Sequence, residues 1–203
     1  MERIVGGVLA GGGSRRYGRD KAFVEWKGRS LVEYALQNVS RLAEETYILS
    51  KEPKKFVHLP WTVIPDITTT PTPISGILSI SPFVKDWLLV AACDILVLDP
   101  EFINTLWGAR EPGKAVIPRT DRGLQPLLAI YPKEVLGYWE QAYRSGNFKL
   151  RSVVENMPRT EVDISKLRAS SSSEARETRG EQGLPPFRNI NRPEDLPEVI
   201  SVY

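Results

Sequence analysis

The chain has 203 residues, of which 41% are hydrophobic and 26% charged, and its formal net charge is +2. This length and composition predict one soluble α/β domain with room for a second small lobe. The charge is too small to indicate nucleic-acid binding, and no apolar run approaches the roughly twenty residues that cross a membrane.

The cysteine content bears on the cellular compartment. Cys93 is the one cysteine, so no disulfide can form within the chain, and a reducing cytoplasm is favoured. Glu2 and Arg3 precede no long apolar stretch, so no secretory signal is expected. We therefore predict a cytoplasmic protein without a membrane partner.

Apolar runs alternate with helical patterns in the first half of the chain. Ser30 and Glu33 have the spacing of a capping box at the start of the first helix. The expected strands cover residues 3–9, 45–50, 61–64 and 87–92. The expected helices cover about 30–42, 74–81 and 100–107. This alternation predicts a parallel sheet with right-handed crossovers.

The second half is less regular. Expected strands cover 115–118, 127–131 and 160–164, expected helices 132–143 and 150–155, and a last helical turn 192–196. Residues 168–186 contain four consecutive serines and few apolar side chains. Such a composition cannot pack a core, so this segment is expected to be a mobile loop.

A glycine-rich loop follows the first expected strand. Residues 11–13 are all glycine, and Arg16 and Lys21 come soon after them. Glycines let backbone N–H groups approach a ligand, so the loop predicts phosphate binding, with a structural turn as the alternative. The loop is not a P-loop, because Arg19-Asp20 stands where that motif requires Lys-Ser/Thr. It is not a dinucleotide-binding fingerprint either, because Arg16 stands at the position of the third glycine.

Asp94 is the strongest candidate for a metal ligand. It comes directly after Cys93, at the end of the apolar strand expected at 87–92. Open α/β sheets bind ligands at this carboxyl edge, and Mg²⁺ on a nucleotide needs only one or two protein carboxylates. A helix cap or a loop aspartate is the alternative for Asp94.

Two cations and two amides are further candidates. Lys21 suits a point charge on nucleotide phosphates, and Arg16 can hold two oxygens at once, although a lysine is more often simply solvated. Asn189 and Asn191 are two residues apart, so on an extended chain both amides point to one side. A turn and a helix cap are the alternatives for these asparagines.

Five motifs run in order along the chain. They are Leu9-Ala10-Gly11-Gly12-x-Ser14-x-Arg16-x-Gly18-x-Asp20-Lys21, Pro65-Asp66 followed by Thr72-Pro73-Ile74-Ser75-Gly76, Cys93-Asp94, Gln125-Pro126-Leu127, and residues 187–196. Together they resemble the MobA-like nucleotidyltransferases, the molybdenum cofactor guanylyltransferases. The chain departs from the family pattern at Tyr17, usually Met, and at Ala92 and Leu96, usually prolines. Ser50-Lys51-Glu52 also stands where the family often has an asparagine that contacts the nucleotide.

The resemblance implies a fold and a reaction. The fold would be a three-layer α/β/α sandwich with a mostly parallel sheet, of the nucleotide-diphospho-sugar transferase type. Residues 1–203 would form one domain, with a nucleotide-binding part at about 1–110 and an acceptor-binding part at about 111–203. The reaction would move GMP from GTP to the phosphate of molybdenum-bound molybdopterin and release pyrophosphate, with Mg²⁺ as cofactor and no enzyme nucleophile.

The resemblance also implies roles for particular residues. The nucleotide contacts would be Leu9, Ala10, Gly11, Gly12, Gly13, Ser14, Lys21, Asp66 and Asp94. The acceptor contacts would be Gln125, Asn189 and Asn191. Asp94, Lys21 and Arg16 would be catalytic, with Asp94 as the metal ligand. Molybdoenzymes or cofactor-delivery proteins are the expected protein partners.

Two other functions are alternatives. The first is a cytidylyltransferase of the same fold acting on molybdopterin or an isoprenoid phosphate. Asp20-Lys21 argues against the isoprenoid type, whose similar loops have Pro before the lysine, and the Asn-x-Asn pattern favours the guanylyl branch. The second is an adaptor that binds nucleotide without turnover, against which the intact Asp94 argues.

Overall fold

The computed structural model describes residues 2–11, 20–97, 99, 101–164 and 186–196. The predictions for Gly12, Gly13, Ser14 and Arg16, and for nearly all of the 168–186 loop, lie outside the described residues. None of the helices within the described ranges has the length and hydropathy needed to cross a bilayer.

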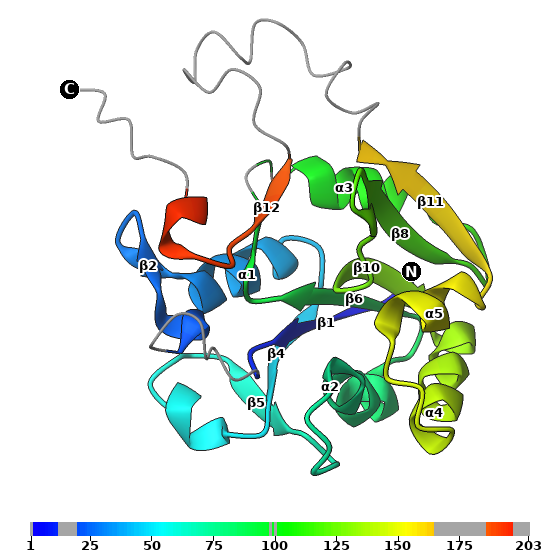
Figure 1. Cartoon of the computed structure of the whole chain (residues 1–203), viewed down its shortest axis with the longest axis horizontal. Helices are drawn as coiled ribbons and strands as arrows, with labels where there is room; N and C mark the ends of the chain where they lie inside the picture. Colours follow the sequence, from blue (N-terminus) through cyan, green and yellow to red (C-terminus); the bar gives the residue numbers. More distant parts are fainter. Residues whose placement is uncertain (1, 12–19, 98, 100, 165–185, 197–203) are drawn as a thin grey trace, which may run out of the picture.

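An eight-stranded sheet forms the middle of the molecule (Figure 1). Its strands are β1 (Ile4–Leu9), β4 (Glu45–Ser50), β5 (Thr62–Pro65), β6 (Trp87–Ala92), β8 (Ala115–Thr120), β9 (Gly123–Leu124), β10 (Leu128–Pro132) and β11 (Arg159–Asp163). The order is β11-β8-β10-β6-β1-β4-β5, with β9 paired to β8. Along this order β10 runs antiparallel to both of its neighbours, and the other pairs are parallel.

Helices cover both faces of the sheet. Figure 1 shows α1 (Leu31–Val39) and α3 (Glu101–Gly108) on one side. On the other side are α2 (Pro73–Ile80), α4 (Leu136–Arg144) and α5 (Leu150–Glu155). Side chains alternate along β1, so Val8 packs in the core under α1 and α3, and Leu9 packs in the core under α2 and α4. The predicted three-layer α/β/α fold is confirmed.

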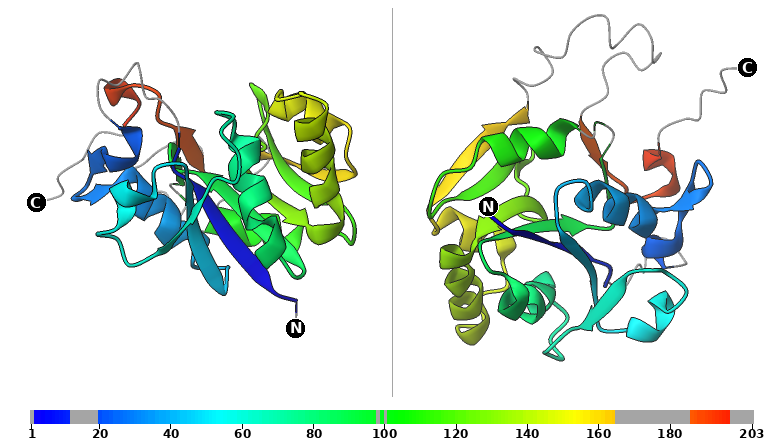
Figure 2. Two further views of the ribbon diagram at one scale, coloured as in Figure 1. Left: turned by 90° about the horizontal axis from the view of Figure 1, so that it is seen from below. Right: turned by 180° about the vertical axis from the view of Figure 1, so that it is seen from behind.

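Two short ribbons stand apart from the main sheet. One is the hairpin of β2 (Glu25–Trp26) and β3 (Arg29–Ser30), which follows the 3₁₀ turn η1 (Lys21–Phe23). The other pairs β7 (Ile95–Val97) with β12 (Phe187–Asn189). The turn η5 (Pro193–Asp195) then lies next to the hairpin, as Figure 2 shows from two further sides.

A small apolar cluster joins this C-terminal segment to the hairpin. Ile190 is buried with Val24 and Leu31, and Leu196 and Trp26 pack against the same cluster. The cluster therefore holds the C-terminal segment against the hairpin, although the two are far apart in the sequence.

Several predicted boundaries differ from the structure. Helix α1 ends at Val39 rather than 42, because the chain must turn back to begin β4 at Glu45. The helix expected from 132 begins with a 3₁₀ turn, η4 (Lys133–Val135), and becomes α4 only at Leu136. Strand β7 was not predicted, because a three-residue strand carries no readable period and forms only by pairing with β12.

The close contact between β1 and α1 predicts that a larger residue at Gly6 destabilises the fold. A Cβ at this position would lie 2.2 Å from Val39 Cγ1 and 3.0 Å from Ala43 Cβ. We expect Gly6→Ala to lower the free energy of unfolding by roughly 1–3 kcal/mol, because α1 must shift from the sheet. Urea denaturation would measure this. Gly137→Ala is the control, since a Cβ on Gly137 meets nothing within 4 Å and helix α4 should keep or gain stability.

Candidate active site

The carboxyl ends of β1, β4, β5 and β6 meet at one edge of the sheet, where open α/β sheets bind ligands. Backbone bonds fix the start of the glycine loop there. Ala10 N donates to Leu49 O at 3.0 Å, and Cys93 N donates to Leu9 O at 3.0 Å. Gly11 is exposed at this edge. The predicted nucleotide contacts Leu9, Ala10 and Gly11 therefore lie beside the end of β6.

Lys21 links three distant segments of the chain. Its Nζ donates to Asp94 Oδ2 at 3.0 Å and to Asn191 Oδ1 at 3.1 Å. The side chains of Lys21 and Asp94 are 17% and 34% exposed, so the pair is partly shielded but reachable by a ligand. Ile190 N also donates to Asp94 O at 2.7 Å, which ties β12 to the end of β6. The structure thus brings together three of the predicted site residues.

Asp20 explains how Lys21 is oriented. Its Oδ1 accepts from Ala22 N at 3.2 Å and so caps the turn η1 that begins at Lys21. Its Oδ2 lies 2.9 Å from Lys55 Nζ, which also pairs with Glu52 at 2.9 Å. Both oxygens of Asp20 are therefore engaged in holding the turn that presents Lys21.

Asp94 is the predicted metal ligand at this edge of the sheet. No group of three or more His, Cys, Asp or Glu side chains able to hold a metal occurs among the residues that the structure describes. A nucleotide-bound Mg²⁺ takes most of its ligands from phosphates and water and needs only one or two protein carboxylates. Asp94 offers a partly exposed carboxylate for this purpose.

Asp66 follows β5 at the same edge. Its backbone N donates to Ser50 O at 3.3 Å. Burial raises the pKa of the Asp66 carboxyl, and the charge of Lys51 opposes this. A Cβ on Gly76 would lie 2.4 Å from Leu9 Cδ2 and 3.6 Å from Asp66 Oδ1. Gly76 therefore permits the close packing of α2 against Leu9 at the end of β1, a role that its motif alone did not reveal.

Cys93 has no reactive character in this setting. It is a free, partly buried thiol next to Asp94. Burial, followed by the charges of Asp94 and Asp20, raises the pKa of the Cys93 thiol, so the neutral form dominates. A nucleophilic role for Cys93 is therefore not supported.

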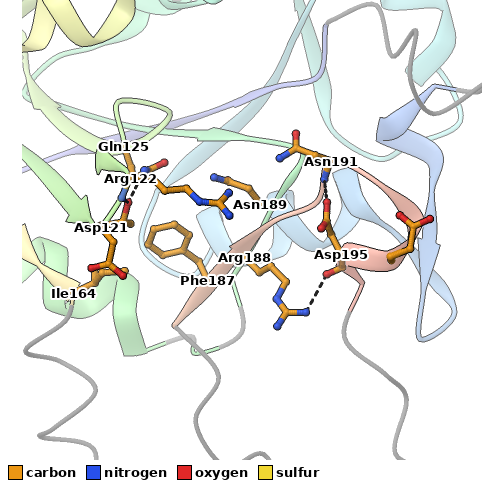
Figure 3. Close-up of a pocket in the computed structure, with 11 residues that line it drawn as sticks. Asp121, Arg122, Gln125, Ile164, Phe187, Arg188, Asn189, Asn191 and Asp195 are labelled. Carbon is orange, nitrogen blue, oxygen red and sulfur yellow. Dashed lines mark hydrogen bonds between the residues drawn. The ribbon is translucent and has the colours of Figure 1, made fainter.

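A cavity of about 520 Å³ opens beside this cluster (Figure 3). The predicted acceptor contacts Gln125, Asn189 and Asn191 all line it. Its other lining residues are Thr120, Asp121, Arg122, Ile164, Phe187, Arg188, Glu194 and Asp195. Asn191 therefore belongs both to this cavity and to the Lys21–Asp94 cluster.

Asp195 shapes the cavity wall and was not predicted. Its Oδ2 accepts from Asn191 N at 2.6 Å and from Arg192 N at 2.7 Å, and these bonds lower the pKa of the carboxyl. Its backbone O accepts from Arg188 Nη1 at 3.2 Å. Asp195 thus fixes the backbone at Asn191, whose side-chain oxygen accepts from Lys21. The available signal was the three-residue spacing of Arg192 and Asp195, which an acidic residue of a capping box has from its N-cap.

A protein-family comparison decides the family. The model of the MobA-like NTP transferase domain matches residues 6–162. The chain belongs to this family. The match begins within β1 and ends within β11, so it reaches every strand of the central sheet of this MobA-like protein.

Individual relatives extend the similarity to the C-terminal segment. A probable molybdenum cofactor guanylyltransferase of Clostridium perfringens is 32% identical over 145 residues, 70% of this chain and 73% of the relative. One from Pelotomaculum thermopropionicum is 29% identical over 199 residues, 97% of this chain and 91% of the relative. The solved molybdopterin-guanine dinucleotide biosynthesis protein A from Archaeoglobus fulgidus is 27% identical, with a TM-score of 0.73 and 94% of each chain covered. The family resemblance read from the motifs is confirmed.

Proposed function

We propose that this MobA-like protein is a molybdenum cofactor guanylyltransferase, which moves GMP from GTP to the phosphate of molybdenum-bound molybdopterin. The observation that carries the proposal is the position of Lys21 between Asp94 and Asn191. This cation stands where the sheet edge meets the 520 Å³ cavity, so it can face donor and acceptor phosphates together. The names of the relatives support the choice of substrates.

On the donor side, the proposal assigns the nucleotide to the edge formed by Leu9, Ala10, Gly11 and Asp66. Gly12, Gly13, Ser14 and Arg16, outside the described residues, are proposed to continue this cradle. Asp94 would hold Mg²⁺, which supplies charge neutralisation to the triphosphate. The residues that we assign to the nucleotide all lie in the part of the chain at about 1–110.

On the acceptor side, an oxygen of the molybdopterin phosphate attacks the α-phosphorus of GTP. The new P–O bond forms as the bond to the β-phosphate oxygen breaks, and the electron pair leaves with pyrophosphate. Lys21 would stabilise the negative charge that grows on these oxygens. Asn191, held by Asp195, keeps Lys21 at the junction. Positioning and charge neutralisation are sufficient for such a transfer.

The reaction can be tested directly. The protein is incubated with Mg²⁺, molybdenum-loaded molybdopterin and either GTP or CTP, and pyrophosphate and dinucleotide are measured. We expect both products with GTP and loss of activity when EDTA removes the metal. Product with CTP alone would establish the cytidylyltransferase alternative. Nucleotide binding without product from either would establish the adaptor. A cytoplasmic location and delivery partners stay predictions.

A further inference from the structure

The turn between β8 and β9 carries Arg122 into the wall of the cavity. Thr120 Oγ1 organises this turn, because it accepts from Arg122 N at 3.1 Å and donates to Gly123 O at 3.1 Å. Gly123 has a φ of 99°, a conformation that other residues rarely adopt. The backbone at Arg122 is therefore held in one arrangement.

Gln125 belongs to the same turn. Its Nε2 donates to Thr120 Oγ1 at 3.0 Å and to Gly123 O at 3.1 Å. The amide nitrogen of Gln125 thus braces the turn, although the sequence motif had indicated acceptor binding. This leaves the side-chain oxygen of Gln125 as its ligand-facing group.

A second arginine supports the turn from α5. Arg151 Nη2 donates to Arg122 O. The guanidinium of Arg151 also packs on Gly123, where a Cβ would lie 3.0 Å from Arg151 Cζ. Helix α5 therefore buttresses the backbone that presents Arg122.

The side chain of Arg122 itself is uncommitted. Within the described ranges its guanidinium makes no hydrogen bond or ion pair, whereas Arg188, the other arginine of the cavity wall, donates to Asp195 O. Figure 3 shows the Arg122 side chain reaching across the cavity toward Asn189, with Asn191 on the far side. Arg122 is exposed, and a guanidinium beside a polar cavity and without a partner in the described part of the chain is suited to an oxyanion, which it can bind through two parallel bonds.

No carboxylate of the cavity wall forms an ion pair with Arg122 among the described residues. The Asp195 carboxylate is occupied by Asn191 N and Arg192 N. Asp121 and Glu194 are exposed and form no ion pair among the described residues. The Arg122 guanidinium is therefore available to a ligand, as far as the described residues show.

Resting on the proposed function, we propose that Arg122 binds an anionic group of the acceptor and that Arg151 positions it. Lys21 and Asp94 lie on the Asn191 side, so Arg122 belongs to the acceptor rather than to GTP. The anion is either the phosphate or the oxo-molybdenum group of the cofactor. Arg122 thereby adds an acceptor contact outside the motifs at 125–127 and 187–196.

Arg122→Gln tests this, because it keeps every backbone bond of the turn. We expect the dissociation constant of molybdenum-loaded molybdopterin, measured anaerobically, to rise roughly ten- to a hundredfold. The dissociation constant of GTP and the unfolding midpoint should not change. Arg144→Gln is the matched control, because this exposed arginine pairs only with Glu140 among the described residues.

Metal-free molybdopterin distinguishes the two anions. Equal weakening of both forms assigns Arg122 to a group common to both, such as the phosphate, and weakening of the molybdenum-loaded form alone assigns it to the oxo-molybdenum group. Unchanged affinity of Arg122→Gln for both forms would overturn the proposal, as would a wild-type protein that binds neither. If the wild type makes no dinucleotide yet binds molybdopterin more tightly than Arg122→Gln, the proposed reaction fails and the Arg122 assignment stands.

The positioning role of Arg151 has its own readout. Arg151→Gln should weaken acceptor binding, and adding it to Arg122→Gln should weaken binding no further. Independent, additive losses in this cycle would show that Arg151 does not act through Arg122.

Discussion

Asp94→Ala is expected to lower the rate of guanine dinucleotide formation by at least roughly a thousandfold. Asp94 is the carboxylate that ends β6 beside Lys21, and the proposed Mg²⁺ would lose this protein ligand. Asp94→Asn should have a similar effect, since an amide of the same shape brings no charge. The measurement is the initial rate of dinucleotide formation at saturating GTP and acceptor, repeated over a series of Mg²⁺ concentrations.

The same variant should fold normally. The Asp94–Lys21 pair is partly exposed, so its loss should cost only about 1 kcal/mol. The bond from Ile190 N is made to the backbone O of Asp94 and survives the substitution. Asp86→Ala is the control, because Asp86 stands just before β6 at the opposite end of that strand and accepts from Arg3 N. Collapse of the fold in Asp94→Ala, or full activity in it, would refute the catalytic assignment.

Lys21→Met is expected to lower the same rate by roughly a hundred- to a thousandfold, because it removes the cation while keeping an unbranched side chain. Lys21 Nζ is the one described group that bonds both Asp94 and Asn191, so the loss should affect the transfer step and raise the KM for GTP. Steady-state kinetics with each substrate varied in turn would measure both effects.

The magnesium requirement separates the two variants. Asp94→Asn should raise the Mg²⁺ concentration for half-maximal rate, whereas Lys21→Met should not, because it leaves the carboxylate in place. Lys114→Met is the control for loss of a cation, since Lys114 pairs with Glu111 away from the site. Equal shifts in the magnesium requirement would contradict the separate roles proposed for Lys21 and Asp94.

The sequence was most informative where the pattern that predicts an element lies within one contiguous segment. Strands β4 and β6 begin and end where their apolar runs predicted, and Ser30 and Glu33 form the expected capping box. Asp94 could be predicted as a ligand-binding residue because it follows a continuous buried strand, and the carboxyl edge of a parallel sheet is a general ligand site. The family followed from ordered motifs that no single element contains.

Contacts between distant segments could not be predicted from the sequence. Arg122 and Arg151 lie outside the motifs, and the 187–196 motif contains Asp195 without revealing its role. Each of the three acts through backbone groups or turns whose shape depends on folding. Strand β7 likewise exists only because β12 pairs with it.

The sequence by itself determined the layers of the fold, the family and the glycine loop as a phosphate-binding candidate, because hydrophobic period and local motifs are properties of contiguous residues. The tertiary structure decided that Lys21 lies between Asp94 and Asn191, which are 73 and 170 residues away. It also decided that Arg122 points into the cavity while Gln125 braces its turn. Such placements depend on strand order and chain reversal, which bring together side chains that no local pattern relates.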